Sequence, residues 1–220
     1  MRALAFVRAR LLLLTKRLLA PLLYRNPPFR LQPARLYVWL DALHETRDIS
    51  GSVVEIGSDL CGTAVIAHRM LKQLGAPRRY ICIDTFTGFV GSQFDQDLVL
   101  GVPGGYREMF SVNSVGLVRR VLKQHHAGEI ELVQADIAEY QGLPDEIAAC
   151  LIDVDLSMPT YQALNKVYAK LVPGGVICVD DCPDGYDWKP RAGYTRFVRE
   201  QGLSEDYRFG MGIVRKRPRS

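Results

Sequence analysis

Short apolar runs alternate with amphipathic stretches from residue 51 to the end of the chain. Each apolar run is nearly continuous and is bounded by glycine or charged residues, which is typical of a buried strand. The predicted strands are 52–57, 79–84, 130–136, 148–155 and 176–181, with two shorter ones near 207–209 and 212–214. Apolar residues at helical spacing predict helices at 62–74, 112–125, 159–171 and 192–200.

Strands that alternate with helices in this way form a mostly parallel sheet with helices on both faces. The sequence therefore predicts an α/β fold in residues 51–220, preceded by an N-terminal helical segment over residues 1–50. The connection over residues 86–111 is long and rich in Gly, Asp and Gln. A long insertion after the carboxyl end of a strand is often a lid over a binding site, and we expect one here.

The two ends of the chain carry most of its positive charge, and the formal net charge is only +4. Charged ends are usually solvated, so nucleic-acid binding is not expected. The five cysteines are scattered and form no CxxC pair. Most lie in or beside apolar runs, which is typical of small buried side chains in a reducing compartment. We therefore expect a cytoplasmic protein.

The first 28 residues combine a basic start with the apolar tetrad Leu11–Leu14. Charges recur too often for a signal peptide, and no run approaches the roughly 20 residues of a membrane span. We expect an amphipathic helix that packs on the domain or on a partner subunit, and hence a homo-oligomer. A helix lying on a membrane surface is the minority alternative.

An acidic residue stands at or near the end of every predicted central strand. Parallel strands all end at one edge of the sheet, which is where open α/β sheets bind ligands. A row of acids at this edge would repel one another without polar ligands or a cation. The residues are Glu55, Asp84, Asp136, Asp153 with Asp155, and Asp180 with Asp181.

The loop "GSDLCGT" after the first strand has the glycines of a ligand-binding turn. It lacks both the GxGxxG spacing of dinucleotide-binding proteins and the lysine of a phosphate loop, so an NAD enzyme is a weak alternative. Asp84 is placed to accept two hydrogen bonds from a ribose diol, and Asp136 could reach an adenine amino group. Histidines 125 and 126 are read as surface residues, and His68 as a helix-packing residue.

Several motifs together resemble the macrocin O-methyltransferase family of class I S-adenosylmethionine-dependent methyltransferases, over residues 51–213. They are "VVEIGSDLCGTA", "IDTFTGF", "LIDVDLSMPT" and "LVPGGVICVDD". The resemblance implies a Rossmann-like, seven-stranded, mostly parallel sheet and O-methylation of a sugar or other natural product. It also implies a cofactor site formed by Glu55, Gly57, Ser58, Gly62, Thr63, Asp84, Thr85, Phe86, Asp136, Ile137 and Asp153.

The resemblance further implies that Asp153, Asp180 and Asp181 bind one Mg²⁺ ion, which prefers hard oxygen ligands. A metal bound to two adjacent hydroxyls would lower the pKa of one of them, and a base would then take its proton. Asp155 or Asp153 is the candidate base, because Leu156 stands where related catechol-type enzymes have a lysine. Two alternatives remain open: a metal-independent methyltransferase with Asp155 as base, and a non-catalytic binding protein.

The chain also departs from the family, which usually has aromatic residues at the positions of Ser157 and Cys182. Both positions face the acceptor side in the implied fold, so the acceptor is expected to differ from a macrolide sugar. Tyr106, Phe110, Tyr186 and Trp188 are candidates for the wall of an acceptor pocket.

Overall fold

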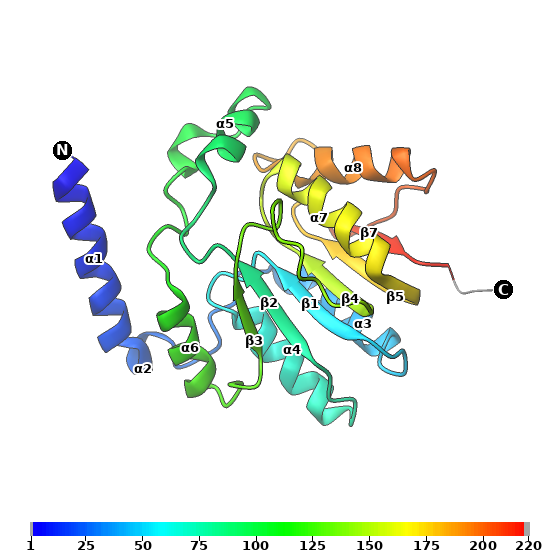
Figure 1. Cartoon of the computed structure of the whole chain (residues 1–220), viewed down its shortest axis with the longest axis horizontal. Coiled ribbons are helices and arrows are strands. Elements are labelled where there is room, and N and C mark those ends of the chain that lie inside the picture. Colours follow the sequence, from blue (N-terminus) through cyan, green and yellow to red (C-terminus); the bar gives the residue numbers. More distant parts are fainter. Residues whose placement is uncertain (1, 218–220) are drawn as a thin grey trace.

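The computed structural model describes residues 2–217, and within them seven strands form one sheet (Figure 1). The strand order is β3-β2-β1-β4-β5-β7-β6. Strands β1 to β5 pair in parallel, whereas β7 is antiparallel to both β5 and β6. The predicted α/β class and the mostly parallel, seven-stranded sheet are confirmed. The bounds are β1 Ser52–Ile56, β2 Tyr80–Asp84, β3 Glu131–Gln134, β4 Ile147–Ile152, β5 Leu171–Val179, β6 Tyr207–Arg208 and β7 Met211–Arg215.

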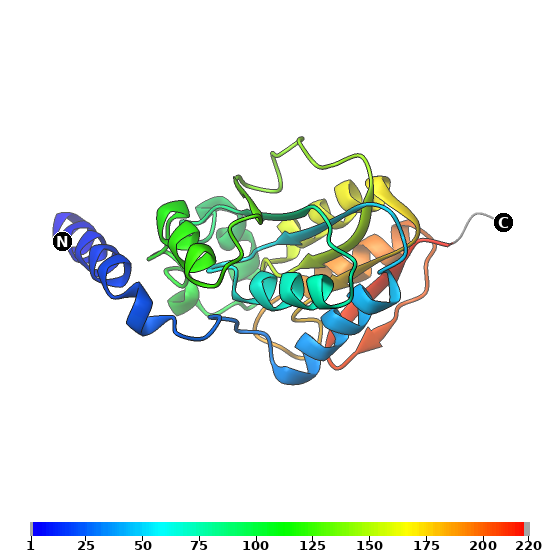
Figure 2. The same ribbon diagram turned by 90° about the horizontal axis from the view of Figure 1, so that it is seen from below.

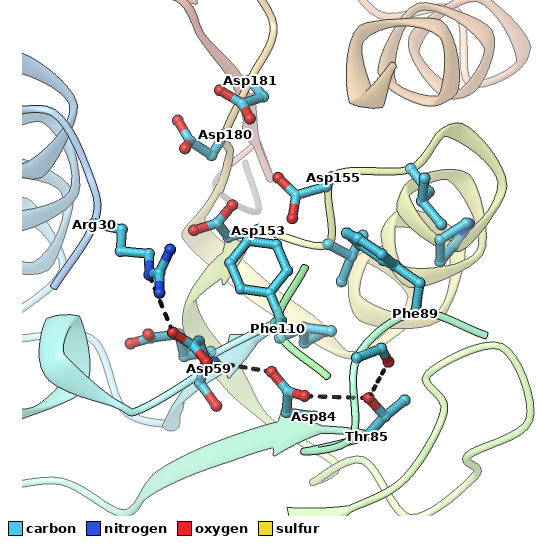
Figure 3. Close-up of a pocket in the computed structure, with 18 of the residues that line it drawn as sticks. Arg30, Asp59, Asp84, Thr85, Phe89, Phe110, Asp153, Asp155, Asp180 and Asp181 are labelled. Carbon is cyan, nitrogen blue, oxygen red and sulfur yellow. Dashed lines mark hydrogen bonds and ion pairs between the residues drawn. The ribbon is translucent and has the colours of Figure 1, made fainter. Parts of the chain in front are cut away.

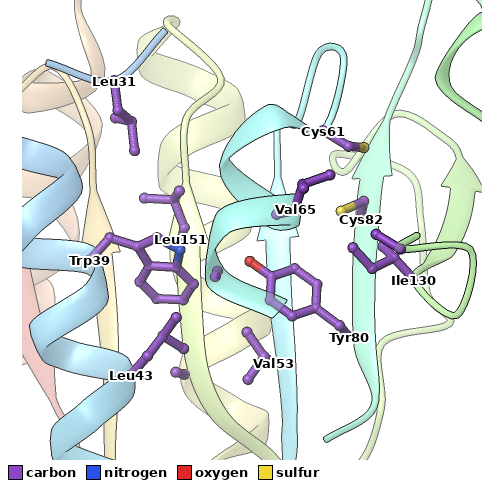
Figure 4. Close-up of a cluster of buried hydrophobic side chains, with 14 of the residues drawn as sticks. Leu31, Trp39, Leu43, Val53, Cys61, Val65, Tyr80, Cys82, Ile130 and Leu151 are labelled. Atoms are coloured by element: carbon purple, nitrogen blue, oxygen red, sulfur yellow. The ribbon is translucent and has the colours of Figure 1, made fainter. Parts of the chain in front are cut away.

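Helices cover both faces of this sheet (Figures 1 and 2). Helices α3 (Pro33–Glu45), α4 (Gly62–Gln73) and α6 (Val115–Gln124) pack on one face, and α7 (Ser157–Lys170) and α8 (Pro190–Glu200) pack on the other. Adjacent strand residues serve opposite faces because side chains alternate along a strand. Val53 packs with Trp39 and Val65 (Figure 4), and Val54 packs in the opposite cluster with Leu164.

Two strands differ from the sequence prediction. β3 is the edge of the sheet, and its polar end residues Glu131 and Gln134 are exposed, so it is not buried on both faces as its apolar run suggested. The run predicted at 148–155 ends its pairing at Ile152. Beyond Ile152 the chain turns, and Asp155 adopts a left-handed backbone with φ of 62°. The acids after β4 therefore lie in a loop at the carboxyl edge.

The start of the N-terminal segment lies at one end of the molecule, beside α6 (Figure 1). Helices α1 (Arg2–Leu18) and α2 (Ala20–Leu23) contact α6, and Lys16 Nζ donates to the carbonyl of Val112 at 2.9 Å. From the sequence, His125 was predicted to lie on the surface, but it is buried. Its Nε2 lies 3.0 Å from the carbonyl oxygen of Tyr24, in the segment that follows α2. The segment therefore contacts the domain, which is one of the two expected packings, while most of α1 from residue 7 onward is exposed.

The outer side of α1 remains apolar and exposed, with Leu11 and Leu18 more than half accessible. Within residues 2–217, no helix is long and apolar enough to cross a membrane. Residues 1 and 218–220, at the limits of the predicted segment 1–50 and domain 51–220, lie outside the described residues. All five cysteines are buried and unpaired, as small apolar side chains are expected to be.

The long connection at 86–111 contains helix α5 (Gly91–Val99) and a short 3-10 turn, Gly104–Tyr106. Asp97 of α5 is fully buried and fixes the insertion to the start of α7. Its carboxylate accepts hydrogen bonds from the Ser157 backbone N–H, at 2.6 Å, and from the Ser157 hydroxyl. Phe94, Leu156 and Trp188 pack in the same small cluster. The insertion is thus held at the carboxyl edge of the sheet.

Candidate active site

A cavity of about 270 Å³ lies at the carboxyl edge of the sheet (Figure 3). The ends of β1, β2, β4 and β5 line it, together with residues from the N-terminal segment and from the insertion. Four of its lining residues adopt left-handed backbones without being glycine: Asp59, Phe110, Asp155 and Asp181. Strained backbones of this kind gather at functional sites, where the surrounding structure fixes them.

The cavity brings together almost every residue that the sequence singled out. Among the residues predicted to hold the cofactor or the metal or to act as the base, the exception is Phe86, whose ring is buried in a core cluster. The residues that do line the cavity are Glu55, Gly57, Ser58, Gly62, Thr63, Asp84, Thr85, Asp136, Ile137, Asp153, Asp155, Asp180 and Asp181. Their individual roles stay predictions.

Asp84 is held in place by backbone donors at one end of the cavity. Its Oδ2 accepts from the Asp59 N–H at 2.9 Å, and its Oδ1 accepts from the Phe86 N–H at 2.6 Å. Burial raises the pKa of Asp84 to about 6 in spite of these donors. Above that pH it is an oriented carboxylate that can accept hydrogen bonds from a ligand diol.

Asp136 links the same end of the cavity to the insertion. Its Oδ2 accepts from the side-chain amide of Gln93 in α5 at 2.7 Å, and its Oδ1 accepts from the Ala138 N–H at 2.9 Å. A ligand bound beside Asp136 would therefore also touch the insertion.

Glu55 lies deeper, at the end of β1, and is almost fully buried. Burial raises its pKa to about 8, although the Tyr80 hydroxyl donates to Oε2 at 2.8 Å and opposes the shift. The side chain therefore holds a proton at neutral pH in the ligand-free protein. A cation bound next to it would favour the ionised form.

The two loop glycines are required by protein contacts. A Cβ at Gly57 would lie 1.9 Å from the Asp153 carbonyl oxygen, and the residue has a φ of +82°. A Cβ at Gly62 would lie 2.2 Å from the backbone of Pro28, in the N-terminal segment. The sequence suggested that these glycines allow a ligand to approach the backbone. In the structure, the absence of a side chain at each makes room for protein backbone, namely the loop after β4 and the segment after α2.

Four aspartates gather on the other side of the cavity, with the Phe110 ring between them and Asp84 (Figure 3). Burial and the carboxylates of Asp180 and Asp155 raise the pKa of Asp153 well above its usual range. Burial and the carboxylates of Asp181 and Asp180 do the same for Asp155. Burial and Asp181 raise the pKa of Asp180 to about 7. We call these four residues, Asp153, Asp155, Asp180 and Asp181, the aspartate cluster.

Arg35 of α3 pairs with this cluster, which sequence reasoning did not anticipate. Its Nη1 donates to Asp180 Oδ1 at 3.1 Å and to Asp181 Oδ1, and the residue is only 5 % exposed. A signal was present, because Arg35 precedes the apolar Val38 and Trp39 by three and four residues. This spacing places Arg35 on the buried stripe of the helix.

The donor set of the aspartate cluster suits a hard divalent cation, since it consists of carboxylate oxygens that repel one another. As the side chains stand, no group of three His, Cys, Asp or Glu residues within the described part of the chain is arranged to hold a metal ion. Two of the three predicted ligands, Asp180 and Asp181, are turned to Arg35 instead. The carboxylate oxygens therefore suit a divalent metal, and Asp180 and Asp181 can bind one only when Arg35 moves away from them.

The apolar wall of the cavity includes Phe110, Tyr186 and Trp188. Tyr106 is not part of this wall; its ring packs against Trp188 in a tilted arrangement, with 4.8 Å between the ring centroids. Ser157 and Cys182, expected to face the acceptor, also do not line the cavity. Ser157 binds the insertion through Asp97, and Cys182 is buried in the core beneath the sheet.

Comparison with known proteins places these features in context. The model of the macrocin O-methyltransferase (TylF) family matches residues 34–208. No curated protein sequence matches the chain.

Solved structures with the same fold include the O-methyltransferase NovP, at a TM-score of 0.68 and 18 % identity, over 84 % of this chain and 80 % of NovP. The calicheamicin methyltransferase CalS11 has a TM-score of 0.68 at 22 % identity, over 94 % of this chain and 90 % of its own. An O-methyltransferase from Bacillus cereus in complex with SAH has a TM-score of 0.52 at 13 % identity, over 91 % and 88 % of the two chains. Identities this low show a shared fold and assign no residue a role.

Proposed function

Because the chain belongs to the macrocin O-methyltransferase family and is an S-adenosylmethionine-dependent O-methyltransferase, we propose that it methylates a hydroxyl of a sugar or similar natural product that carries two adjacent hydroxyls. One observation carries this proposal. A single cavity has an oriented carboxylate at one end, Asp84, and a cluster of four aspartates at the other. The first suits a nucleoside diol, and the second suits hydroxyl groups that must lose a proton.

At the Asp84 end, the residues of this chain bind and orient the methyl donor. Asp84 accepts hydrogen bonds from the ribose, and Asp136 with Ile137 borders the adenine. Glu55 and the loop from Gly57 to Thr63 surround the methionine part. S-adenosylmethionine supplies an electrophilic methyl group on a cationic sulfonium, and the buried acid Glu55 offsets positive charge at that end.

At the aspartate cluster, the residues of this chain orient the acceptor and take its proton. Asp155 or Asp153 acts as the base, because burial and the neighbouring carboxylates raise the pKa of each well above its usual range and so make it a stronger base than an exposed aspartate. Phe110 and Tyr186 border the acceptor and restrict water. Holding the acceptor oxygen in line with the methyl group supplies much of the rate enhancement expected of such an enzyme.

We further propose that Asp153, Asp180 and Asp181 hold one Mg²⁺ ion in the working enzyme. When bound, the ion supplies Lewis-acid polarisation of a hydroxyl and a template for two adjacent oxygens. The carboxylate donor set supports this proposal, and the metal would also offset the repulsion that raises the pKa values in the cluster.

A second candidate is metal-independent methyl transfer on the same fold. It is favoured by the pairing of Arg35 with Asp180 and Asp181, since a guanidinium already offsets part of the negative charge there. In that case Arg35 stays in place during turnover, and Asp155 alone removes the proton. Chelation distinguishes the two candidates.

The test is a methyl-transfer assay with isotope-labelled S-adenosylmethionine and a panel of nucleotide sugars and glycosides. The panel pairs each vicinal diol with its monodeoxy analogue. We expect labelled product from a diol, little from its deoxy partner, loss of activity in EDTA and recovery with Mg²⁺. Full activity in EDTA would support the second candidate. No labelled product from any hydroxyl acceptor, with S-adenosylhomocysteine bound normally, would contradict the proposed reaction.

Three further expectations belong with this proposal. Residues 51–220 form the methyltransferase domain, with 86–111 as its lid and 1–50 as an accessory helical segment. The exposed apolar side of α1 packs against a second copy of the chain in a homo-oligomer. The free, buried thiols are compatible with a reducing compartment, and we propose the cytoplasm.

A further inference from the structure

Arg35 comes from outside the sheet and reaches its carboxylate partners across 145 positions of sequence. It lies in the first turn of α3, and its guanidinium borders the same cavity as the aspartate cluster. Its Cζ also lies 5.6 Å from the centre of the Tyr186 ring. The N-terminal segment thus delivers one cation to a group of four carboxylates.

The hydrogen bonds of Arg35 are incomplete for so deeply buried a guanidinium. One nitrogen, Nη1, donates to both Asp180 and Asp181, while Nε is buried without a hydrogen-bond partner. Buried donors are nearly always paired in folded proteins, and a structural arginine–carboxylate pair usually forms two parallel hydrogen bonds. Arg35 therefore holds both carboxylates through one nitrogen and leaves a buried donor, Nε, unused.

The cluster also holds more carboxyl groups than Arg35 pairs with. Arg35 pairs with Asp180 and Asp181, and Asp153 and Asp155 face the same space. Arg30, the next arginine along the segment that lines the cavity, is engaged elsewhere, with Nε 3.3 Å from Asp59 Oδ2. A divalent cation carries twice the charge of a guanidinium, and it can be bound by oxygens of several of these carboxyl groups at once.

From this geometry we infer that Arg35 is a competitor of the divalent cation: its guanidinium and the metal bind the same carboxylate oxygens of Asp180 and Asp181, one at a time. The inference rests on the metal site proposed above. Metal entry displaces Arg35 from the cluster, and Arg35 lowers the metal affinity of the ligand-free enzyme. Arg35 is a positioning residue, because it acts on the acceptor site through the two aspartates.

The test measures binding of Mn²⁺ alone, by electron paramagnetic resonance of the free ion, to the full chain without donor or acceptor. In Arg35→Met the charge is removed while much of the side-chain length remains, and we expect the Mn²⁺ Kd to fall by about tenfold, equivalent to about 1.4 kcal/mol. Arg30→Met is the matched control, since it removes a cavity-lining arginine that pairs with Asp59. Its Kd should stay close to that of the wild type.

Removing Arg35 leaves buried carboxylates unpaired, so that variant could fail to fold. Arg35→Lys keeps the charge but not the geometry, and its Kd should fall between those of the wild type and Arg35→Met. Adding Asp180→Asn to either variant should abolish the gain in Mn²⁺ affinity, because it removes one of the carboxylates that bind the ion. Equal Kd values in the wild type and the position-35 variants would overturn the inference, as would the absence of Mn²⁺ binding in all of them. Because no methyl transfer is measured, either result is independent of the proposed reaction.

Discussion

The buried carboxyl of Glu55 makes the stability of the ligand-free protein depend on pH. The pKa of Glu55 moves from 4.5 to about 8 on folding, mainly through burial. At about 1.4 kcal/mol per pKa unit, the ionised form is disfavoured in the folded state by about 5 kcal/mol. Since the folded pKa is the higher one, the contribution of Glu55 to stability is fully present below pH 4.5 and is lost as the pH rises to about 8.

Replacing Glu55 by Gln keeps the shape and the hydrogen bond from Tyr80 but removes the titration. Relative to the wild type, E55Q should gain about 3 kcal/mol of unfolding free energy between about pH 5.5 and about pH 9. Urea denaturation followed by the fluorescence of the buried Trp39 gives this difference directly. Acids that do not interact with Glu55 titrate alike in both proteins and cancel in the comparison.

An oppositely directed control comes from Glu131, whose pKa is lowered by the hydrogen bond from Arg79. Both partners are exposed, so E131Q should lose less than about 1 kcal/mol at neutral pH. If the unfolding free energies of the wild type and E55Q run parallel across this pH range, Glu55 is ionised in the folded protein and the burial argument is wrong.

Other changes test the cavity and its supports. D84N should weaken S-adenosylhomocysteine binding by about tenfold to a hundredfold in calorimetry, because hydrogen bonds to a charged group contribute about 1.5–3 kcal/mol; an unchanged affinity would exclude Asp84 from the nucleoside site. In the wild type the same affinity should fall as the pH drops below about 6, where Asp84 takes up a proton. D97A removes the acceptor of both Ser157 hydrogen bonds and should cost about 1–3 kcal/mol of stability in thermal denaturation, which an unaltered Tm would contradict. G57A should fail to fold because its Cβ would overlap backbone, whereas G105A meets open space and should express normally; equal expression of the two would refute the packing argument.

The sheet and its acid-lined edge could be predicted from the sequence because both depend on local patterns. Apolar runs such as that ending in Glu55 mark buried strands, and parallel strands all end at one edge. The same reasoning predicts that Asp84 and Asp180 lie at one edge of the sheet, and both line the cavity. The motifs then predicted the family, because each motif combines several residue types at a defined spacing along the chain.

What escaped prediction depends on contacts between distant segments. Arg35 and Asp97 each lie in a helix whose partners are far along the chain, and a helical pattern does not name the residue that a buried polar group will face. The sequence pattern predicted that His125 lies on the surface, but Tyr24 of the N-terminal segment contacts it and it is buried. The edge strand β3 was mistaken for a central one because an apolar run does not reveal its place in the sheet order.

The central claim is that one cavity holds the methyl donor at Asp84 and the acceptor at the aspartate cluster. A crystal structure of the chain soaked with S-adenosylhomocysteine tests it most directly. The account predicts ribose hydroxyls within hydrogen-bonding distance of Asp84 and the sulfur directed across the cavity toward Asp153 and Asp155. Density for the ligand at another surface, or with its sulfur facing away from those aspartates, would contradict it.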